Sequence, residues 1–268
     1  MDHYGDLLDL IRINRGLETI AEAMREAEAF LGEAAEGWRT HEPLRRGVVD
    51  ISDNKKRDAA ERLVSRSGPI AGTQAAAYLG TRGLSTPGDA DLLFHPNAFY
   101  RDGDEKMRSG PALIAPIRSC NGTLLSVHRT WFDSGLVLIR KMMGFPEDGY
   151  VNLGGEGPDV LVGEGIETLL SLAPALNGVR THALLTATRL AAYEPTDDVK
   201  RLFIAVDRDA AGFAAARRAY KTASSRGVQV KFLIPLCCFR GADFNDDLKR
   251  LGAGRLAANL KRKTGSPN

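Results

Sequence analysis

The chain has 268 residues, of which 43% are hydrophobic and 26% are charged, a composition typical of a globular protein with one or two buried cores. No apolar run approaches the roughly 20 residues that span a bilayer, and the acidic N-terminus lacks a signal-peptide layout, so we expect a cytoplasmic protein with no membrane segment. The 36 basic and 34 acidic residues give a net charge of only +2, which excludes a globally basic nucleic-acid-binding protein but is compatible with a local basic groove.

The cysteines and the isolated histidines show no metal-binding or disulfide pattern. Cys237 and Cys238 are adjacent, Cys120 is distant, and no Cys-x-x-Cys pair occurs. We therefore expect neither a zinc ribbon nor a disulfide framework. His95 and His128 have no second ligand spaced near them, so we interpret both as packing or hydrogen-bonding residues.

Residues 1–54 are predicted to form an N-terminal helical region and a linker. Apolar residues recur at roughly helical spacing between residues 5 and 35, and Gly16 is typical of a break between two helices. Two interpretations stay open: an amphipathic pair that packs or dimerises, and a surface that docks a partner. Residues 36–54 hold scattered charges and are interpreted as the linker.

Residues 55–150 are predicted to form a smaller α+β subdomain. Its first helix is expected from residue 57 to residue 67 and is opened by Lys55, Lys56 and Arg57. These cations either contact nucleic-acid phosphates or lie on a solvated helix face. A second helix is predicted from Gln74 to Thr81.

The middle of this subdomain is rich in β-strand patterns. Strands are expected at residues 91–96, 112–118, 123–131 and 136–143. The pair Asn121-Gly122 favours a type I′ hairpin between the second and third of them. A segment rich in Gly, Pro and acids then predicts a boundary, with a further domain over residues 151–268.

The C-terminal part shows three apolar strands, each followed by carboxylates. The strands are expected at residues 159–163, 202–206 and 228–235. Helical patterns follow each strand, so we expect an α/β fold with a parallel sheet, and the carboxyl ends of its strands place ligands at one edge. The carboxylates that follow these strands are Glu164, Asp207, Asp209, Asp243 and Asp246.

This arrangement of carboxylates predicts a cation site. Asp207 and Asp209 are two residues apart on an extended segment, so their side chains point the same way and repel unless a cation lies between them. Mg²⁺ is the simplest such cation because it is hard and takes oxygen ligands. The alternative is a polar turn in which Asp caps the following helix. Glu167 either points at the site or orients the first helical turn.

The pattern Glu164-Gly165-x-Glu, then Asp207-x-Asp-x-x-Gly212, then Asp243-x-x-Asp246, resembles the Toprim domain. Primases, type IA and II topoisomerases and some nucleases share that fold, and the pattern is most similar to DnaG-like primases of phages and mobile elements. The resemblance implies that Glu164, Asp207 and Asp209 are catalytic. It also implies a two-ion site of Mg²⁺ or Mn²⁺ whose ligands are those three residues with Asp243 and Asp246. Such primases usually carry an N-terminal zinc module, whose pattern this sequence lacks.

A looser resemblance extends into the β-rich segment. In the primases a strand–turn–strand unit ends in an arginine and a lysine follows on the next strand, both facing nucleotide or template. Arg129 and Lys141 stand at the matching places. An arginine held on a strand suits bidentate phosphate contact, and a lysine supplies a point charge. Exposed strand charges without such a role are the alternative.

The resemblance implies an enzyme of the nucleotidyltransferase class. We expect a primase that joins NTPs on single-stranded DNA during replication of a phage, plasmid or mobile element, with a replicative helicase as a possible partner. A Toprim nuclease uses the same metals and stays open as an alternative. A non-catalytic replication accessory protein is the third hypothesis, although clustered carboxylates without a cation only destabilise a fold.

Overall fold

The computed structural model divides the chain into two compact units, residues 1–50 and residues 51–268. It describes residues 51–101, 106–133, 136–144, 146, 148–176 and 178–264, together with Arg15, Gly16, Leu17, Thr19, Glu22 and Glu26. Most of the helical pair and the linker expected in residues 1–54 lie outside the described residues. The helices searched in the described part include none long and apolar enough to cross a membrane.

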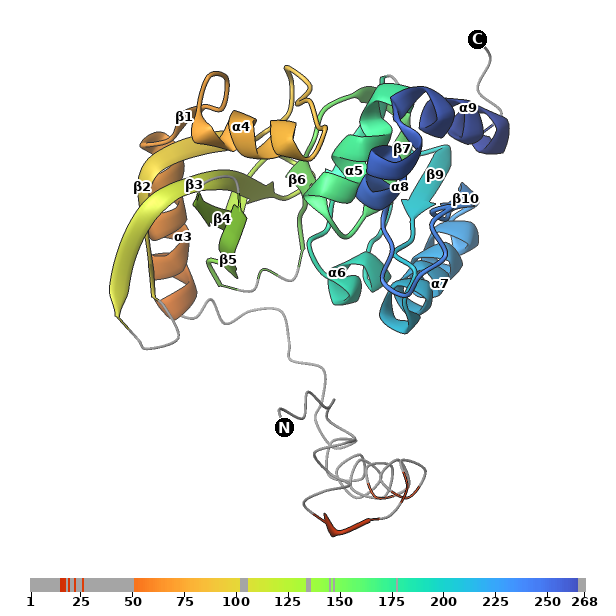
Figure 1. Ribbon diagram of the computed structural model, residues 1–268, viewed down its shortest axis with the longest axis horizontal. Coiled ribbons are helices and arrows are strands. Elements are labelled where there is room, and N and C mark those ends of the chain that lie inside the picture. Colours follow the sequence, from red (N-terminus) through yellow and green to blue (C-terminus); the bar gives the residue numbers. More distant parts are fainter. Residues whose placement is uncertain are drawn as a thin grey trace. The chain divides into compact units, whose positions relative to one another are not determined.

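The second unit begins with an antiparallel sheet of five strands in the order β1-β2-β3-β4-β5 (Figure 1). Helix α3 (Ile51–Ser65) contacts β2 and β4, and helix α4 (Gln74–Thr81) contacts β3. The strands are β1 (Gly68–Pro69), β2 (Leu93–Arg101), β3 (Met107–Arg118), β4 (Leu124–Asp133) and β5 (Leu136–Met142).

The two faces of this sheet contribute to different cores because side chains alternate along a strand. On β3, Ala112 and Ile114 pack in a cluster with Trp131 and with Ala60 of α3. The intervening Leu113 joins a separate cluster that includes Tyr78 of α4. The sheet therefore presents one face to α3 and the other to α4 and the main core.

Three local predictions for this region need correction. Helix α3 begins at Ile51, inside the expected linker, and β2 continues past Pro96 to Arg101 with a register shift between His95 and Ala98. The turn after β3 is longer than a two-residue hairpin, and Gly122 has a positive φ of 84° while Asn121 does not. A type I′ turn requires positive φ at both central residues, so that turn type is wrong here.

A second five-stranded sheet follows in the order β10-β9-β7-β8-β6. Strands β7, β8, β9 and β10 are parallel, and β6 pairs antiparallel with β8 at the edge. The expected α/β fold with a parallel sheet is confirmed. The strands are β6 (Val151–Asn152), β7 (Glu156–Gly163), β8 (Val179–Ala183), β9 (Arg201–Ala205) and β10 (Gln229–Leu233).

Helices cover both faces of this sheet (Figure 1). Val162 and Ile204 pack in the cluster that contains Ala215 of α7, whereas Leu161 and Phe203 pack in the cluster that contains Leu169 of α5. Strands buried on both faces account for the continuous apolar runs in the sequence. The helical elements are α5 (Ile166–Leu172), η1 (Ala173–Ala175), α6 (Ala187–Ala191), α7 (Ala210–Ser225), α8 (Phe244–Leu251) and α9 (Ala253–Thr264).

Candidate active site

The carboxyl ends of three neighbouring parallel strands form one edge of the second sheet. Strand β9 pairs with β7 on one side and β10 on the other, with Ile204 opposite Val162 and Ala205 opposite Leu233. Glu164 follows the end of β7, and Asp207 follows the end of β9. The sheet register therefore places these two carboxylates on adjacent strand ends, at the edge that the strand pattern predicts.

Arg208 ties the loop after β9 to the loop after β10. Its backbone N–H donates to the Ala242 carbonyl at 3.1 Å, and its carbonyl accepts from Gly241 N–H at 2.9 Å. Its Nε donates to the Pro235 carbonyl at 3.0 Å. These bonds hold Asp243, the next residue after Ala242, beside the Asp207 loop.

Gly212 allows the first turn of α7 to lie against the Asp207 backbone. A Cβ at position 212 would lie 2.6 Å from the Asp207 carbonyl oxygen, which is closer than any unstrained contact. Asp209 caps the same helix, since its Oδ1 accepts from Gly212 N–H at 2.7 Å. The Asp-x-Asp-x-x-Gly spacing thus has a steric and a capping reason, and Asp209 keeps its second oxygen for another partner.

Asp207 interacts electrostatically with the other three carboxylates of this sheet edge, Glu164, Asp243 and Asp209. Burial raises its pKa to about 7, and the negative charges of Glu164, Asp243 and Asp209 add to the increase. Burial and the Asp209 charge also raise the pKa of Glu164. The Oδ1 atom of Asp207 is buried and has no hydrogen-bond partner among the residues that the structure describes. Carboxylates that are this close and this poorly solvated are stabilised by a cation.

The donor chemistry fits a hard divalent cation. In the part of the chain that the structure describes, no three His, Cys, Asp or Glu side chains are arranged to hold a metal ion as they stand. The unpartnered Asp207 oxygen and the surrounding carboxylates nevertheless supply the oxygen ligands that Mg²⁺ and Mn²⁺ take. The edge is therefore a candidate metal site.

Asp243 and Asp246 form a capping box at the start of α8. Asp243 Oδ1 accepts from Asp246 N–H at 3.0 Å, and Asp246 Oδ2 accepts from Asp243 N–H at 3.1 Å. Asp243 Oδ2 lies 3.3 Å from the Thr168 hydroxyl. Both expected metal ligands thus have helix-capping bonds in this structure, and their metal roles stay predictions.

Asp247 is an important acidic residue that sequence reasoning missed. It is fully buried, and its two oxygens accept from the backbone N–H groups of Leu236 and Cys237 at 2.6 and 2.7 Å. It fixes the loop between β10 and α8. The residues that it binds lie ten and eleven positions upstream, so no local pattern in the sequence indicates this role.

Glu167 does not point freely at the edge. Its Oε1 accepts from the Tyr78 hydroxyl at 2.5 Å and pairs with Arg140 Nη2 at 2.7 Å. Burial raises the pKa of Glu167, but the Tyr78 hydrogen bond and the Arg140 charge outweigh this and lower it. Of the two interpretations left open for Glu167, the orienting one matches these bonds. Sequence reasoning missed Arg140 and Tyr78.

Arg129 lies on the α3 face of the first sheet. Its guanidinium stacks 5.0 Å from the Trp131 ring, its Nη1 lies 3.5 Å from the Phe99 carbonyl, and its Nε is buried without a partner. Lys141 is directly opposite Arg129 across β4 and β5. Arg129 also lines a hollow of about 290 Å³ together with Arg62, Arg66 and His95.

Lys55, Lys56 and Arg57 are exposed on the first turns of α3. Like Arg129, they belong to the α3 side of the sheet. Arg140 occupies the other face, where it reaches Glu167. The nucleotide-binding roles expected for Arg129 and Lys141, and for Lys55, Lys56 and Arg57, stay predictions.

Two family matches cover most of the second unit. Residues 159–254 match the Toprim domain. This part of the chain is a Toprim domain. Residues 54–153, which precede it, match a domain of unknown function, DUF7146. No curated protein sequence matches the chain.

Solved primase structures share the fold. The Aquifex aeolicus primase, with its zinc-binding and RNA polymerase domains, is 18% identical, with a TM-score of 0.51 over 95% of this chain and 70% of that one. A DnaG primase catalytic domain bound to ssDNA is also 18% identical, with a TM-score of 0.50 over 79% of each chain. The expected Toprim primase fold of DnaG-like type, with an α+β region before the Toprim domain, is confirmed.

Proposed function

We propose that this protein is a primase, which joins NTPs into an RNA primer on a single-stranded DNA template. The observation that carries the proposal is the buried, unpartnered Oδ1 of Asp207, surrounded by carboxylates at the edge of a Toprim sheet. The primase fold supports the reaction class. The setting proposed for it is the replication of a phage, plasmid or mobile element in the cytoplasm, beside a replicative helicase.

The available oxygens rank the proposed metal ligands. Asp207 offers a free oxygen, Asp209 keeps one oxygen outside its cap, and Glu164 lies on the adjacent strand end. Asp243 follows, because a capping bond and the Thr168 hydroxyl engage its two oxygens. Asp246, which like Asp209 uses one oxygen in a capping bond, is the remaining proposed ligand. A divalent cation bound here, Mg²⁺ or Mn²⁺, would neutralise negative charge on the phosphoryl oxygens during phosphodiester formation, and we propose a second ion at the same site.

We assign three roles to residues of the chain: catalysis, positioning of the catalytic carboxylates, and phosphate binding. Asp207, Asp209 and Glu164 are the proposed catalytic carboxylates, and Gly212 and Arg208 keep them in place through the contacts above. Arg129 and Lys141 are proposed to bind phosphates of the nucleotide or template. The α3 cations Lys55, Lys56 and Arg57 are proposed to contact further phosphates of the nucleic-acid backbone.

A primer-synthesis assay tests the proposal. The full-length chain is incubated with single-stranded DNA, labelled NTPs and Mg²⁺ or Mn²⁺, and the products are separated on a gel. The primase proposal predicts oligoribonucleotides from the wild type and none from Asp207→Asn. Shortened DNA instead of new RNA identifies a nuclease, and bound but unchanged DNA identifies an accessory protein; either result overturns the primase proposal.

A further inference from the structure

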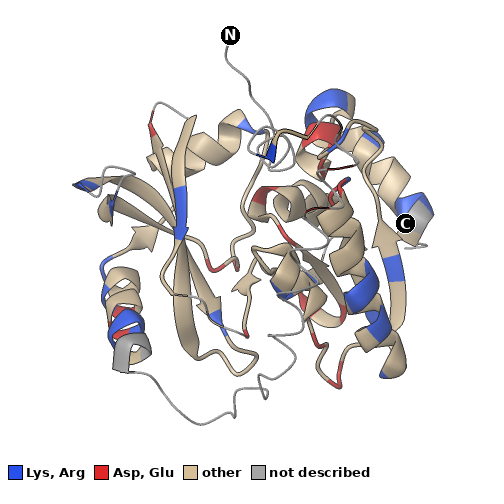
Figure 2. Cartoon of the chain, turned by 90° about the horizontal axis from the view of Figure 1, so that it is seen from below, with Lys and Arg blue, Asp and Glu red and all other residues tan. Residues whose placement is uncertain are grey.

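The charged residues of helix α7 are all basic. The helix contains Arg217, Arg218 and Lys221 and no Asp or Glu, although the chain as a whole has nearly equal numbers of both charges. Figure 2 shows basic and acidic residues intermixed over much of the chain, with basic residues alone on this helix. A run of three cations without a carboxylate on one helix is therefore a local feature of α7.

Among the described residues, these three cations have no partner. All three are exposed, and within the described residues none of them forms an ion pair or a hydrogen bond. By contrast, Arg226 at the C-terminal cap of the same helix pairs with Glu194 at 2.7 Å. Positive charges held near one another without counter-charges attract an anionic ligand.

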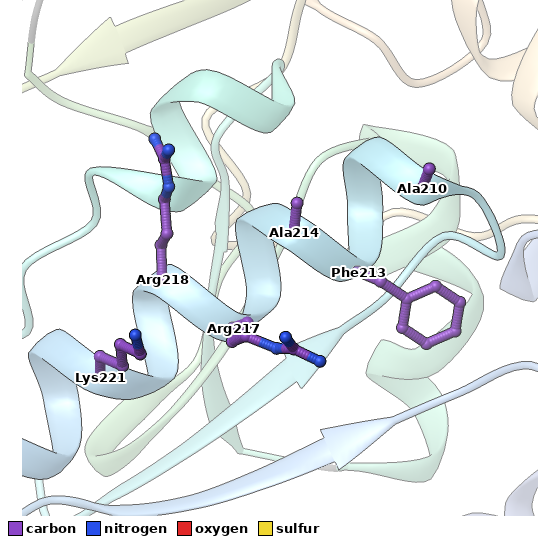
Figure 3. A pocket seen from close by; sticks show the side chains of 6 residues that line it. All are labelled: Ala210, Phe213, Ala214, Arg217, Arg218 and Lys221. Atoms are coloured by element: carbon purple, nitrogen blue, oxygen red, sulfur yellow. The ribbon is translucent and has the colours of Figure 1, made fainter.

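The three cations border a shallow hollow of about 380 Å³ that runs along the helix. Ala210 and Ala214 form its floor, and Figure 3 shows their Cβ atoms pointing to the same side as Arg218. Phe213 and Arg217 extend to the other side. The floor lacks long side chains, so an extended polymer can lie along the helix between Arg218 on one side and Phe213 and Arg217 on the other.

Aromatic rings accompany the cations. Phe213 is 46% exposed, and Tyr220 and Phe232 are each 42% exposed. Phe213, Arg217 and Tyr220 are spaced i, i+4, i+7, so they lie on one face of α7. Tyr220 also contacts Phe232 of the edge strand β10, with ring centroids 5.6 Å apart. Exposed aromatic rings between cations are typical of surfaces that bind single-stranded nucleic acid, where bases stack and phosphates pair.

We propose that α7 binds single-stranded nucleic acid, with phosphates on Arg217, Arg218 and Lys221 and bases on Phe213 and Tyr220. The inference rests on the proposed function for its biological meaning. Asp209 of the candidate metal site is the N-cap of this helix. A helix of this length extends about 24 Å from that site. The strand on α7 is thus a continuation of the strand at the catalytic carboxylates.

Fluorescence anisotropy with labelled (dT)20 tests this surface in the full-length protein. The buffer contains EDTA, so the result does not depend on metal or on primer synthesis. The variant R217Q/R218Q/K221Q is compared with K249Q/R255Q/R262Q, which removes three exposed charges from α8 and α9. We expect the α7 variant to bind at least tenfold more weakly at 100 mM salt, and its slope of log K against log salt to be shallower by about 2.

The aromatic part of the proposal has its own measurement. Phe213→Ser is expected to weaken binding of (dT)20 roughly fivefold or more and to leave binding of an abasic oligonucleotide of the same length unchanged. Circular dichroism checks that each variant is folded. An equal loss for both oligonucleotides contradicts base stacking on Phe213.

Three results overturn the proposal. The first is a wild type that does not bind (dT)20, and the second is an α7 variant with the affinity and salt slope of the wild type or of the α8/α9 control. The third is an α7 variant that keeps DNA affinity but loses binding to a poly-glutamate peptide, which identifies an acidic protein partner. If the wild type makes no primer but the α7 variant still binds DNA more weakly than the wild type, the proposed function is refuted. The proposal that α7 binds single-stranded nucleic acid then stands.

Discussion

Arg140 Nη2 lies 2.7 Å from Glu167 Oε1 and thereby connects the antiparallel sheet to the Toprim domain. Arg140 is on β5, and Glu167 is in the first turn of α5, three residues after Glu164. The Tyr78 hydroxyl of α4 donates to the same oxygen at 2.5 Å. The Glu167 side chain is only 15% exposed. Three elements from both parts of the second unit therefore meet at one carboxylate.

Loss of the Glu167 charge is expected to destabilise the fold. Glu167→Gln keeps the shape of the side chain but weakens its bonds with Arg140 and Tyr78. We expect the free energy of unfolding to fall by about 1.5–3 kcal/mol, the range for hydrogen bonds to charged groups. Urea denaturation measures the change.

Glu194→Gln is the matched control. Glu194 pairs with Arg226 at the same distance of 2.7 Å, but its side chain is 65% exposed. Solvent screens an exposed ion pair, so the expected change is below about 1 kcal/mol. Equal effects of the two substitutions contradict a connecting role for Glu167.

Asp207→Asn is expected to stabilise the metal-free protein while it removes activity. The pKa of Asp207 is raised to about 7 in the fold from about 3.9 in the unfolded chain. Ionisation in this pH range therefore favours the unfolded chain, and the wild type loses stability as the pH rises from about 4 to about 7. The amide has no such charge.

Thermal unfolding in EDTA between pH 5 and pH 8 measures this difference. We expect the Tm of Asp207→Asn to exceed that of the wild type by at least about 2 °C at pH 8, which corresponds to roughly 1 kcal/mol in a protein of this size. The gap narrows toward pH 5. Mg²⁺ or Mn²⁺ is expected to raise the Tm of the wild type but not that of Asp207→Asn. An equal increase in the Tm of both proteins argues against Asp207 as a ligand.

Gly212→Ala is expected to displace the Asp207 loop. The added Cβ would lie 2.6 Å from the Asp207 carbonyl oxygen, so the helix or the loop has to shift, at a cost of about 1–3 kcal/mol. Primer synthesis is expected to fall more than stability alone explains, because Asp207 and Asp209 move. Gly254→Ala on α9 is the control, since nothing lies within 4 Å of its added Cβ, and it is expected to be neutral or slightly stabilising.

His182 is expected to limit stability in acid. The ring is buried and stacks on Tyr150 at a centroid distance of 3.7 Å. Burial and the nearby Arg180 charge lower its pKa to about 3. Because the unfolded imidazole has a pKa of about 6.5, the unfolded chain binds a proton first, and stability is lost as the pH falls from about 6.5 toward 3.

His182→Phe keeps the stacked ring and removes the titrating group. At pH 5 the histidine is expected to cost about 2 kcal/mol relative to pH 7, so the acid-induced loss of stability becomes smaller by about that amount in the variant. Urea denaturation at both pH values measures it. An unchanged pH dependence excludes His182 as the acid-sensitive group.

Local sequence patterns determined the Toprim fold and the order of its carboxylates. Continuous apolar runs specify strands buried on both faces, and parallel strands bring their carboxyl ends to one edge. Glu164 and Asp207 follow β7 and β9 and lie at the expected edge, and the pairing of these two strands was not part of the prediction. The close approach of Gly212 to Asp207 also belongs to a short segment. Each strand and the carboxylate that follows it lie close together in the chain, which is why the sequence alone could indicate them.

Only the tertiary structure decided which charged groups meet. Arg140 rather than Arg129 faces Glu167, because the strand pleat and the pairing of β4 with β5 send neighbouring residues to opposite faces of the sheet. Asp247 turns inward because a loop ten residues upstream offers it two N–H donors. Such choices depend on contacts between segments far apart in the chain. Their free energies come from burial and from long-range hydrogen bonds, which no local pattern of residues records.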